Sequence, residues 1–244
     1  FKVSVILCKP NHEFHTTNQY KKMTKILNEL NLDFIFEDDF KIKKNILDFI
    51  FYQMPYDHFY SDKFHSENIK KNNINICFLQ YGGEIYGGSE SIINCFNLNI
   101  ITSATRIYAR SENHKNLYLK YSPIREDKIL VTGHPKFDKI INKKPSDKIK
   151  NLIPKNKKII LWATSYINKF PPDWCSFYDY FNIVRNFIEQ NKNFFLIFRP
   201  HPLLKQSLDT HKYKVKEVKN FLEFINENEN AILLQDTEYS DLFA

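Results

Sequence analysis

Residues Phe194–Leu204 read FFLIFRPHPLL, and this stretch says the most about the fold. Five consecutive apolar residues, Phe194–Phe198, are typical of a strand that is buried on both faces of a parallel sheet. Two prolines follow and fix the backbone around a single histidine, His201. The sequence therefore predicts a buried parallel strand with Arg199 and His201 at its carboxyl end.

Strand-like apolar runs alternate with helical patterns on both sides of this stretch, and this alternation predicts βαβ units with parallel sheets. The predicted strands are Lys2–Leu7, Leu32–Phe36, Ile46–Tyr52, Ile74–Leu79, Leu98–Thr102, Lys128–Thr132, Ile159–Ala163, Phe194–Phe198 and Ala231–Leu234. The predicted helices are Thr16–Leu30, Glu112–Tyr121, Trp174–Gln190 and Val215–Asn226.

A lysine-rich stretch with two prolines, Lys143–Lys158, separates two such series and predicts a linker. We therefore expect two α/β domains, residues 1–145 and 156–244. The second contains three strand candidates, Ile159–Ala163, Phe194–Phe198 and Ala231–Leu234. A doubly wound domain usually has about five or six strands. This difference predicts that the second domain is incomplete at Ala244.

Composition and charge narrow the classes of function. Of the 244 residues, 43% are hydrophobic, which indicates a globular protein. The net charge of +7 fits either a solvated lysine-rich surface or attraction to anions such as a nucleotide donor, a phosphopolymer or an anionic membrane face, and charge alone does not separate these two interpretations. Basic residues form no stripe with interleaved aromatics, so nucleic acid is not an expected partner. No apolar run reaches the ~18 residues of a membrane span. We expect a cytoplasmic protein, compatible with peripheral association at the inner face of the membrane.

The four cysteines lack the spacing of a metal site, and we expect free thiols and no metal centre. A bound Mg²⁺ beside a nucleotide donor stays compatible with this pattern. Four of the five glycines lie within Gln80–Gly88, directly after a predicted strand. Glycines there permit positive φ and close approach to a ligand, and we expect Gly82 or Gly83 to have a positive φ. The segment does not match GxGxxG, so no dinucleotide fingerprint is predicted.

Ligands of open parallel sheets bind beyond the carboxyl ends of the strands, and three more polar segments fall there. They contain His134 in Thr132–Asp138, the pair Thr164 and Ser165, and the pair Arg199 and His201. Arginine suits bidentate phosphate contacts, whereas imidazole and hydroxyl groups can donate to phosphate oxygens. Phosphate recognition is the chemistry that this set predicts.

Together, six segments resemble the CDP-glycerol glycerophosphotransferase family of the teichoic acid polymerase type. They are QMPYD (53–57), LQYGGEIYGG (79–88), ILVTGHPKFDKI (129–140), ILWATSY (159–166), FRPHPLL (198–204) and LLQDTEYSDLF (233–243). The resemblance implies a GT-B fold of two Rossmann-like domains. It implies a nucleotide-phosphate site at Arg199 and His201, to which we add Thr164, Ser165 and His134, and an acceptor-side loop at Tyr81, Gly82 and Gly83.

The chain departs from the family pattern in the Gly-rich loop. The polymerases carry Trp-His-Gly there, with the histidine as the proposed base, where this chain has Tyr81-Gly82-Gly83. The candidate catalytic groups are therefore His201 and Glu84. The resemblance implies transfer of glycerol phosphate, a related polyol phosphate or a sugar from CDP-glycerol or a similar donor to a capsule or cell-wall polymer. The alternatives are an inactive GT-B-like scaffold module and a sugar-nucleotide epimerase.

Overall fold

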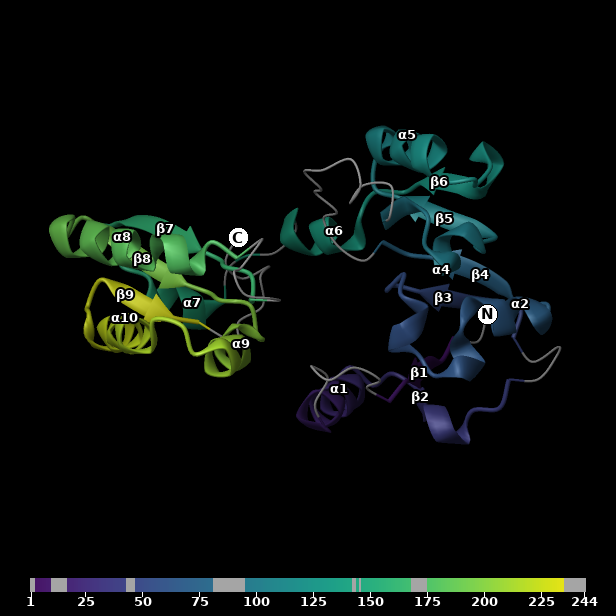
Figure 1. Cartoon of the computed structure of the whole chain (residues 1–244), viewed down its shortest axis with the longest axis horizontal. Coiled ribbons are helices and arrows are strands. Elements are labelled where there is room, and N and C mark those ends of the chain that lie inside the picture. Colours follow the sequence, from purple (N-terminus) through teal and green to yellow (C-terminus); the bar gives the residue numbers. More distant parts are fainter. Residues whose placement is uncertain are drawn as a thin grey trace. The chain divides into compact units, whose positions relative to one another are not determined.

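The computed structural model describes residues 3–9, 17–42, 47–80, 95–141, 144, 146–167 and 175–234. The chain divides into two compact units, Phe1–Phe137 and Asp138–Ala244. Each unit has its own core of buried side chains. The parallel sheets are also separate, two in the first unit and one in the second (Figure 1). The functional division into acceptor-side and donor domains stays a prediction.

The first unit contains two parallel sheets. One pairs β1 (Val5–Leu7) with β2 (Phe34–Phe36), and the other has the order β3-β4-β5-β6. The strands of the larger sheet are β3 (Phe49–Tyr52), β4 (Asn75–Phe78), β5 (Arg106–Ala109) and β6 (Ile129–Val131). The helices are α1 (Thr17–Glu29), α2 (Ser66–Lys71), α4 (Asn99–Thr102) and α5 (Glu112–Tyr121), and a further helix, α6 (Pro135–Ile141), contains the boundary between the two units.

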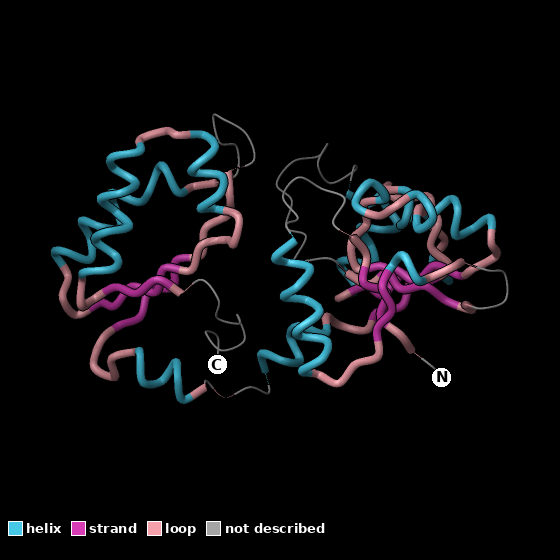
Figure 2. The backbone as a smooth tube through the Cα atoms, turned by 90° about the horizontal axis from the view of Figure 1, so that it is seen from below, coloured by secondary structure: helices cyan, strands magenta, loops and turns pink. Residues whose placement is uncertain are grey.

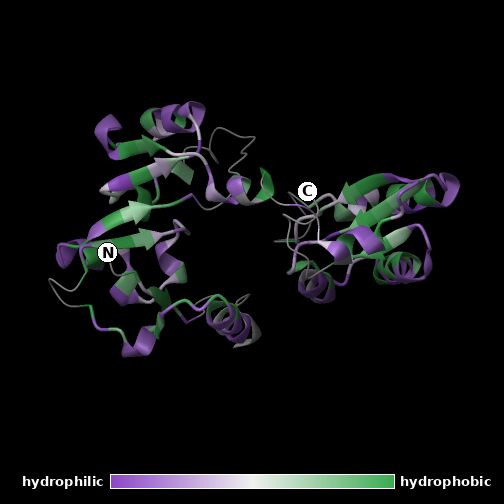
Figure 3. Cartoon of the chain, turned by 180° about the vertical axis from the view of Figure 1, so that it is seen from behind, coloured by the Kyte–Doolittle hydropathy of each residue, from purple (hydrophilic) through white to green (hydrophobic). Residues whose placement is uncertain are grey.

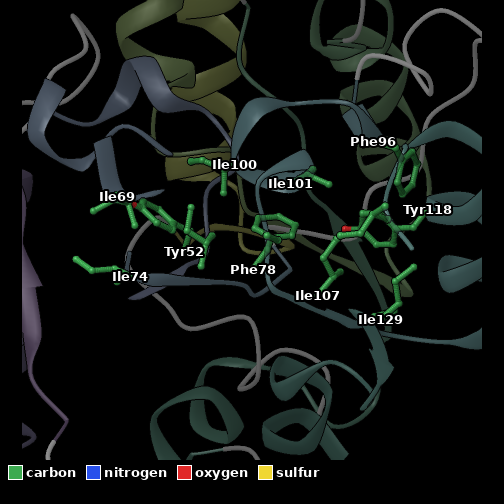
Figure 4. Packing of buried hydrophobic residues seen from close by; sticks show 14 of the residues in the cluster. Tyr52, Ile69, Ile74, Phe78, Phe96, Ile100, Ile101, Ile107, Tyr118 and Ile129 are labelled. Carbon is green, nitrogen blue, oxygen red and sulfur yellow. The ribbon is translucent and has the colours of Figure 1, made fainter. Parts of the chain in front are cut away.

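The core of this unit forms where one face of the larger sheet meets the helices (Figure 4). Phe78 and Ile107 lie at paired positions of β4 and β5, and both are fully buried. Ile100 of α4 and Tyr118 of α5 belong to the same cluster. Each Å² of apolar surface removed from water stabilises the folded state by about 25 cal/mol. This packing therefore fixes the strand ends that carry the polar residues.

The predicted strand Leu98–Thr102 is wrong, since Asn99–Thr102 forms the helix α4. Its β-branched residues favoured a strand, but a helical turn buries both Ile100 and Ile101. The strand of this region is β5, four residues further along, and the sequence analysis missed it. The residues RIYA are short and contain a charge, so they give little strand signal.

The second unit has one parallel sheet of order β7-β8-β9. Its elements are α7 (Asp147–Leu152), β7 (Lys158–Trp162), α8 (Phe177–Gln190), β8 (Phe194–Phe198), α9 (Leu204–His211), α10 (Val215–Glu227) and β9 (Ala231–Leu233). Figure 2 shows the long helices on one side of the sheet and the short helix α7 on the other. This three-layer arrangement explains why β8 is apolar throughout.

Aromatic packing holds this unit together, and Figure 3 shows the apolar strands between more polar helix surfaces. Phe177 and Phe181 of α8 and Phe221 of α10 are fully buried beside Phe198 of β8. On the opposite face, Ile149 of α7 packs in a cluster with Phe195 and Ile197. The stretch predicted as a linker therefore contains a helix that covers part of the second sheet.

Candidate functional site

The carboxyl ends of β7 and β8 hold the loops that the sequence singled out. Backbone pairing continues past both strand ends, because the Arg199 N–H donates to the Trp162 carbonyl at 2.9 Å and the His201 N–H donates to the Thr164 carbonyl at 2.9 Å. The two loops thus lie side by side. This pairing brings together Thr164, Arg199 and His201, as the position of the two segments predicted.

His201 is held in one orientation by the turn that follows it. Its Nδ1 accepts a hydrogen bond from the Leu203 N–H at 3.1 Å, and its carbonyl accepts from the Leu204 N–H at 2.9 Å. Burial, followed by the charge of Arg199, lowers the pKa of His201. A neutral imidazole whose Nδ1 accepts must carry its proton on Nε2. His201 therefore presents a fixed Nε2–H donor.

Arg199 and Thr164 add two more groups that suit a phosphate. The Arg199 side chain is largely buried at the end of β8, and Thr164 is only 6% exposed. Within the described ranges, no group forms a hydrogen bond with Thr164 Oγ1. A guanidinium, an imidazole N–H and a hydroxyl at one sheet edge can together bind phosphate oxygens by charge-assisted hydrogen bonds.

Two residues that the sequence analysis missed fix the loop after β7. Ser207 of α9 is buried, and its Oγ accepts from the Ile167 N–H at 3.1 Å and donates to the Leu204 carbonyl at 2.8 Å. Cys175 donates from Sγ to the Ser165 carbonyl at 3.2 Å. Ser207 therefore ties the loop of Thr164 and Ser165 to the helix that follows His201.

Removing this tie should loosen the loop. We expect Ser207→Ala to lower the free energy of unfolding by about 1–3 kcal/mol, because the buried Ile167 N–H loses its partner. Urea denaturation measures this change. The matched control is Thr210→Ala on the same helix, whose exposed hydroxyl donates to the Gln206 carbonyl within α9. A loss of similar size in both variants would contradict the tie.

His134 lies in the first unit, directly after β6, where Gly133 has a φ of +81°. That φ is in the left-handed region, which favours glycine and turns the chain away from the strand. Nδ1 of His134 accepts from the Lys136 N–H at 3.2 Å, and its carbonyl accepts from the Phe137 N–H at 2.9 Å. The turn around His134 thus repeats the hydrogen bonds of the turn around His201.

Several predicted residues lie outside the described part of the chain. These are Tyr81, Gly82, Gly83 and Glu84, together with most of the segment 233–243. The expected positive φ at Gly82 or Gly83 therefore stays a prediction. Over the described residues, no cluster of three His, Cys, Asp or Glu side chains could hold a metal ion. Nor does any helix there have the length and apolar character needed to cross a membrane.

Three solved structures share the fold of this chain. Staphylococcus aureus MnaA, solved with UDP, matches at a TM-score of 0.50 and 14% identity over 96% of this chain and 57% of its own. The UDP-GlcNAc 2-epimerase of Neisseria meningitidis, bound to UDP-GlcNAc, matches at a TM-score of 0.51 and 14% identity over 95% of this chain and 58% of its own. The UDP-GlcNAc 2-epimerase of Methanocaldococcus jannaschii, in complex with UDP-GlcNAc and UDP, matches at a TM-score of 0.50 and 14% identity over 91% of this chain and 54% of its own.

These likenesses define the class of fold. The chain spans little more than half the length of these structures, and it is an α/β protein of the GT-B type with Rossmann-like units, as the sequence predicted. No curated protein matches its sequence at a significant level. The model of the family described as CDP-Glycerol:Poly(glycerophosphate) glycerophosphotransferase matches residues 96–243, and the chain belongs to this family.

Proposed function

We propose that this chain carries the donor site of a transferase that moves glycerol phosphate, a related polyol phosphate or a sugar from a nucleotide-activated donor to a bacterial capsule or cell-wall polymer. The observation that carries the proposal is the juxtaposition of Arg199, His201 and Thr164 at one sheet edge in a glycerophosphotransferase family member. UDP bound to MnaA, which shares the fold, supports a nucleotide donor. The net charge of +7 supports an anionic acceptor and peripheral association with the inner membrane face.

In the proposed transfer, an acceptor hydroxyl oxygen forms a bond to the phosphorus that carries the glycerol. The bond from that phosphorus to the CMP oxygen breaks, CMP leaves with the electron pair, and the hydroxyl proton passes to a base. Arg199 and the Nε2–H of His201 would stabilise the charge on the departing phosphate. Because His201 donates a hydrogen bond and keeps its proton, it is a stabilising group, and Glu84 stays the candidate base.

One specific observation supports a second candidate, an inactive binding module. Gly82 stands where the polymerases of this family type carry a histidine. Such a module would bind a nucleotide donor without turning it over. Calorimetry with CDP-glycerol, followed by assay for release of CMP in the presence of an acceptor polymer, separates the two candidates.

Replacing His201 should weaken donor binding. We expect His201→Ala to lower the affinity for CDP-glycerol and CMP by about 1.5–3 kcal/mol, the value of one hydrogen bond to a charged group. His134→Ala is expected to have a smaller effect on the same two affinities. Calorimetry on the full chain measures both; equal affinities for wild type and the His201 variant would refute the donor site.

A further inference from the structure

The first unit repeats the histidine turn of the proposed donor site. In both units a histidine-proline pair follows a parallel strand, Nδ1 accepts from the N–H two residues on, and the carbonyl accepts from the N–H three residues on. His134, like His201, therefore holds its proton on Nε2 when neutral. Burial, followed by the charges of Lys136 and Arg110, lowers the pKa of His134. The imidazole is a fixed neutral donor in a positively charged setting.

Arg110 supplies an arginine beside the turn of His134, from the end of a neighbouring strand. It directly follows β5, the neighbour of β6 in the sheet, and its backbone N–H donates to Nδ1 of His114 at 3.3 Å. In the first unit the arginine and the histidine N–H donor therefore lie at the carboxyl ends of two adjacent parallel strands, β5 and β6, whereas in the second unit Arg199 and His201 both follow β8. Ligands of such sheets bind at this edge.

Gln80 supplies an acceptor at the same edge. The residue follows β4 and is 4% exposed. Its Nε2 donates to the Tyr108 carbonyl at 2.7 Å and to the Gly133 carbonyl at 3.2 Å, so the side chain bridges the ends of β5 and β6. In the part of the chain that the structure describes, nothing forms a hydrogen bond with the buried Oε1. A buried acceptor without a donor is unfavourable, and a hydrogen bond from a ligand hydroxyl would offset that cost.

We propose that the carboxyl ends of β4, β5 and β6 form a second anion site, in which Arg110 and His134 bind a phosphate group and Gln80 accepts from a neighbouring hydroxyl. A phosphate next to a hydroxyl is the chemistry of a polyol phosphate, and we assign the site to the glycerol phosphate end of the acceptor. This choice of ligand rests on the proposed function, whereas the anion site itself rests on the residues of the first unit.

The test uses calorimetry on the full chain with glycerol 3-phosphate as the acceptor probe and CMP as the donor probe. His134→Asn keeps an acceptor in the position of Nδ1 and removes the distal N–H, and Arg110→Gln removes the guanidinium. Each should weaken glycerol 3-phosphate binding about tenfold or more and change CMP binding less than about threefold. The charge-matched control is Arg125→Gln, an exposed arginine of the same unit that pairs with Asp127, and we expect it to alter neither affinity.

A second variant separates binding from folding. His134→Gln places an amide N–H where Nε2–H stands and gives up the bond from Lys136, so it should bind glycerol 3-phosphate more tightly than His134→Asn. The reverse order of affinities would show that glycerol 3-phosphate binding depends on the turn and not on the N–H group of residue 134. That result would overturn the site. Unchanged glycerol 3-phosphate affinity in His134→Asn and Arg110→Gln would overturn it as well.

The outcomes also distinguish this site from the donor site. If the His134 and Arg110 variants lose CMP affinity and glycerol 3-phosphate affinity by the same factor, both ligands bind one shared site, and the proposal of a separate second site is overturned. His201→Asn should weaken CMP binding about tenfold and leave glycerol 3-phosphate binding within about threefold of wild type. If it leaves CMP binding unchanged while His134→Asn weakens glycerol 3-phosphate binding, the proposed donor site fails and the second anion site stands.

Discussion

Replacing Arg199 with lysine is expected to weaken nucleotide-donor binding by about 3 kcal/mol, or roughly a hundredfold, although the positive charge is kept. A guanidinium presents a rigid fork of N–H groups that can bind two phosphate oxygens at once, whereas an ammonium is a point charge on a flexible stem. The buried position of Arg199 at the end of β8 makes this geometry matter, because water cannot replace the lost bond. Calorimetry with CDP-glycerol measures the loss.

The control for this variant is Arg185→Lys in the same unit. Arg185 lies on α8 and pairs with Glu189 one turn further along the helix, at a partly exposed position. Exposed pairs of this kind contribute about 0–1 kcal/mol, so we expect no change in donor affinity. Donor affinity of Arg199→Lys within about threefold of wild type would show that Arg199 serves only as a nearby charge.

The part of the candidate site that the sequence predicted depends on local signals. Phe194–Phe198 is a continuous apolar run, and the prolines on both sides of His201 end the strand and set the turn within a few residues. The same is true of the turn at His134, where glycine precedes the histidine and proline follows it. Each of these signals is complete within a short window of sequence.

The residues that the sequence did not predict act over long separations. Ser207 meets Ile167, which lies 40 residues away in the chain, and Gln80 meets Gly133 across 53 residues. A single polar side chain at the end of a strand or inside a helix gives no sequence pattern from which its distant hydrogen-bond partner can be predicted. Arg110 was missed for a related reason, since recognising its position requires β5, whose four residues give little strand signal.

His114, which lies beside Arg110, predicts how the stability of the first unit responds to pH. The side chain is 1% exposed, its Nδ1 accepts from the Arg110 N–H, and its ring packs against Phe96 and Tyr118. Burial, followed by the charges of Arg110 and His134, lowers the pKa of His114 from 6.5 to about 4. The folded protein therefore keeps this imidazole neutral at pH values where the unfolded chain protonates it.

The direction of the effect on stability follows from these two pKa values. Between pH 6.5 and about 4 the unfolded chain binds more protons at this residue than the folded protein does, so lowering the pH favours unfolding. The stability that neutral His114 provides is complete above pH 6.5, is lost as the pH falls toward 4, and falls no further below that. Because one pKa unit is worth about 1.4 kcal/mol, we expect a loss of about 3 kcal/mol from this residue.

Urea denaturation of the wild type and of His114→Asn at pH 7.0 and pH 4.5 tests this expectation. Asparagine keeps an acceptor for the Arg110 N–H but does not titrate, so the variant should lose about 2–3 kcal/mol less stability than the wild type between these two pH values. Carboxylates elsewhere contribute equally to both proteins and cancel in the difference. An equal loss in both proteins would mean that His114 titrates alike in the folded and unfolded chain, and that the interior beside the proposed second anion site is open to water.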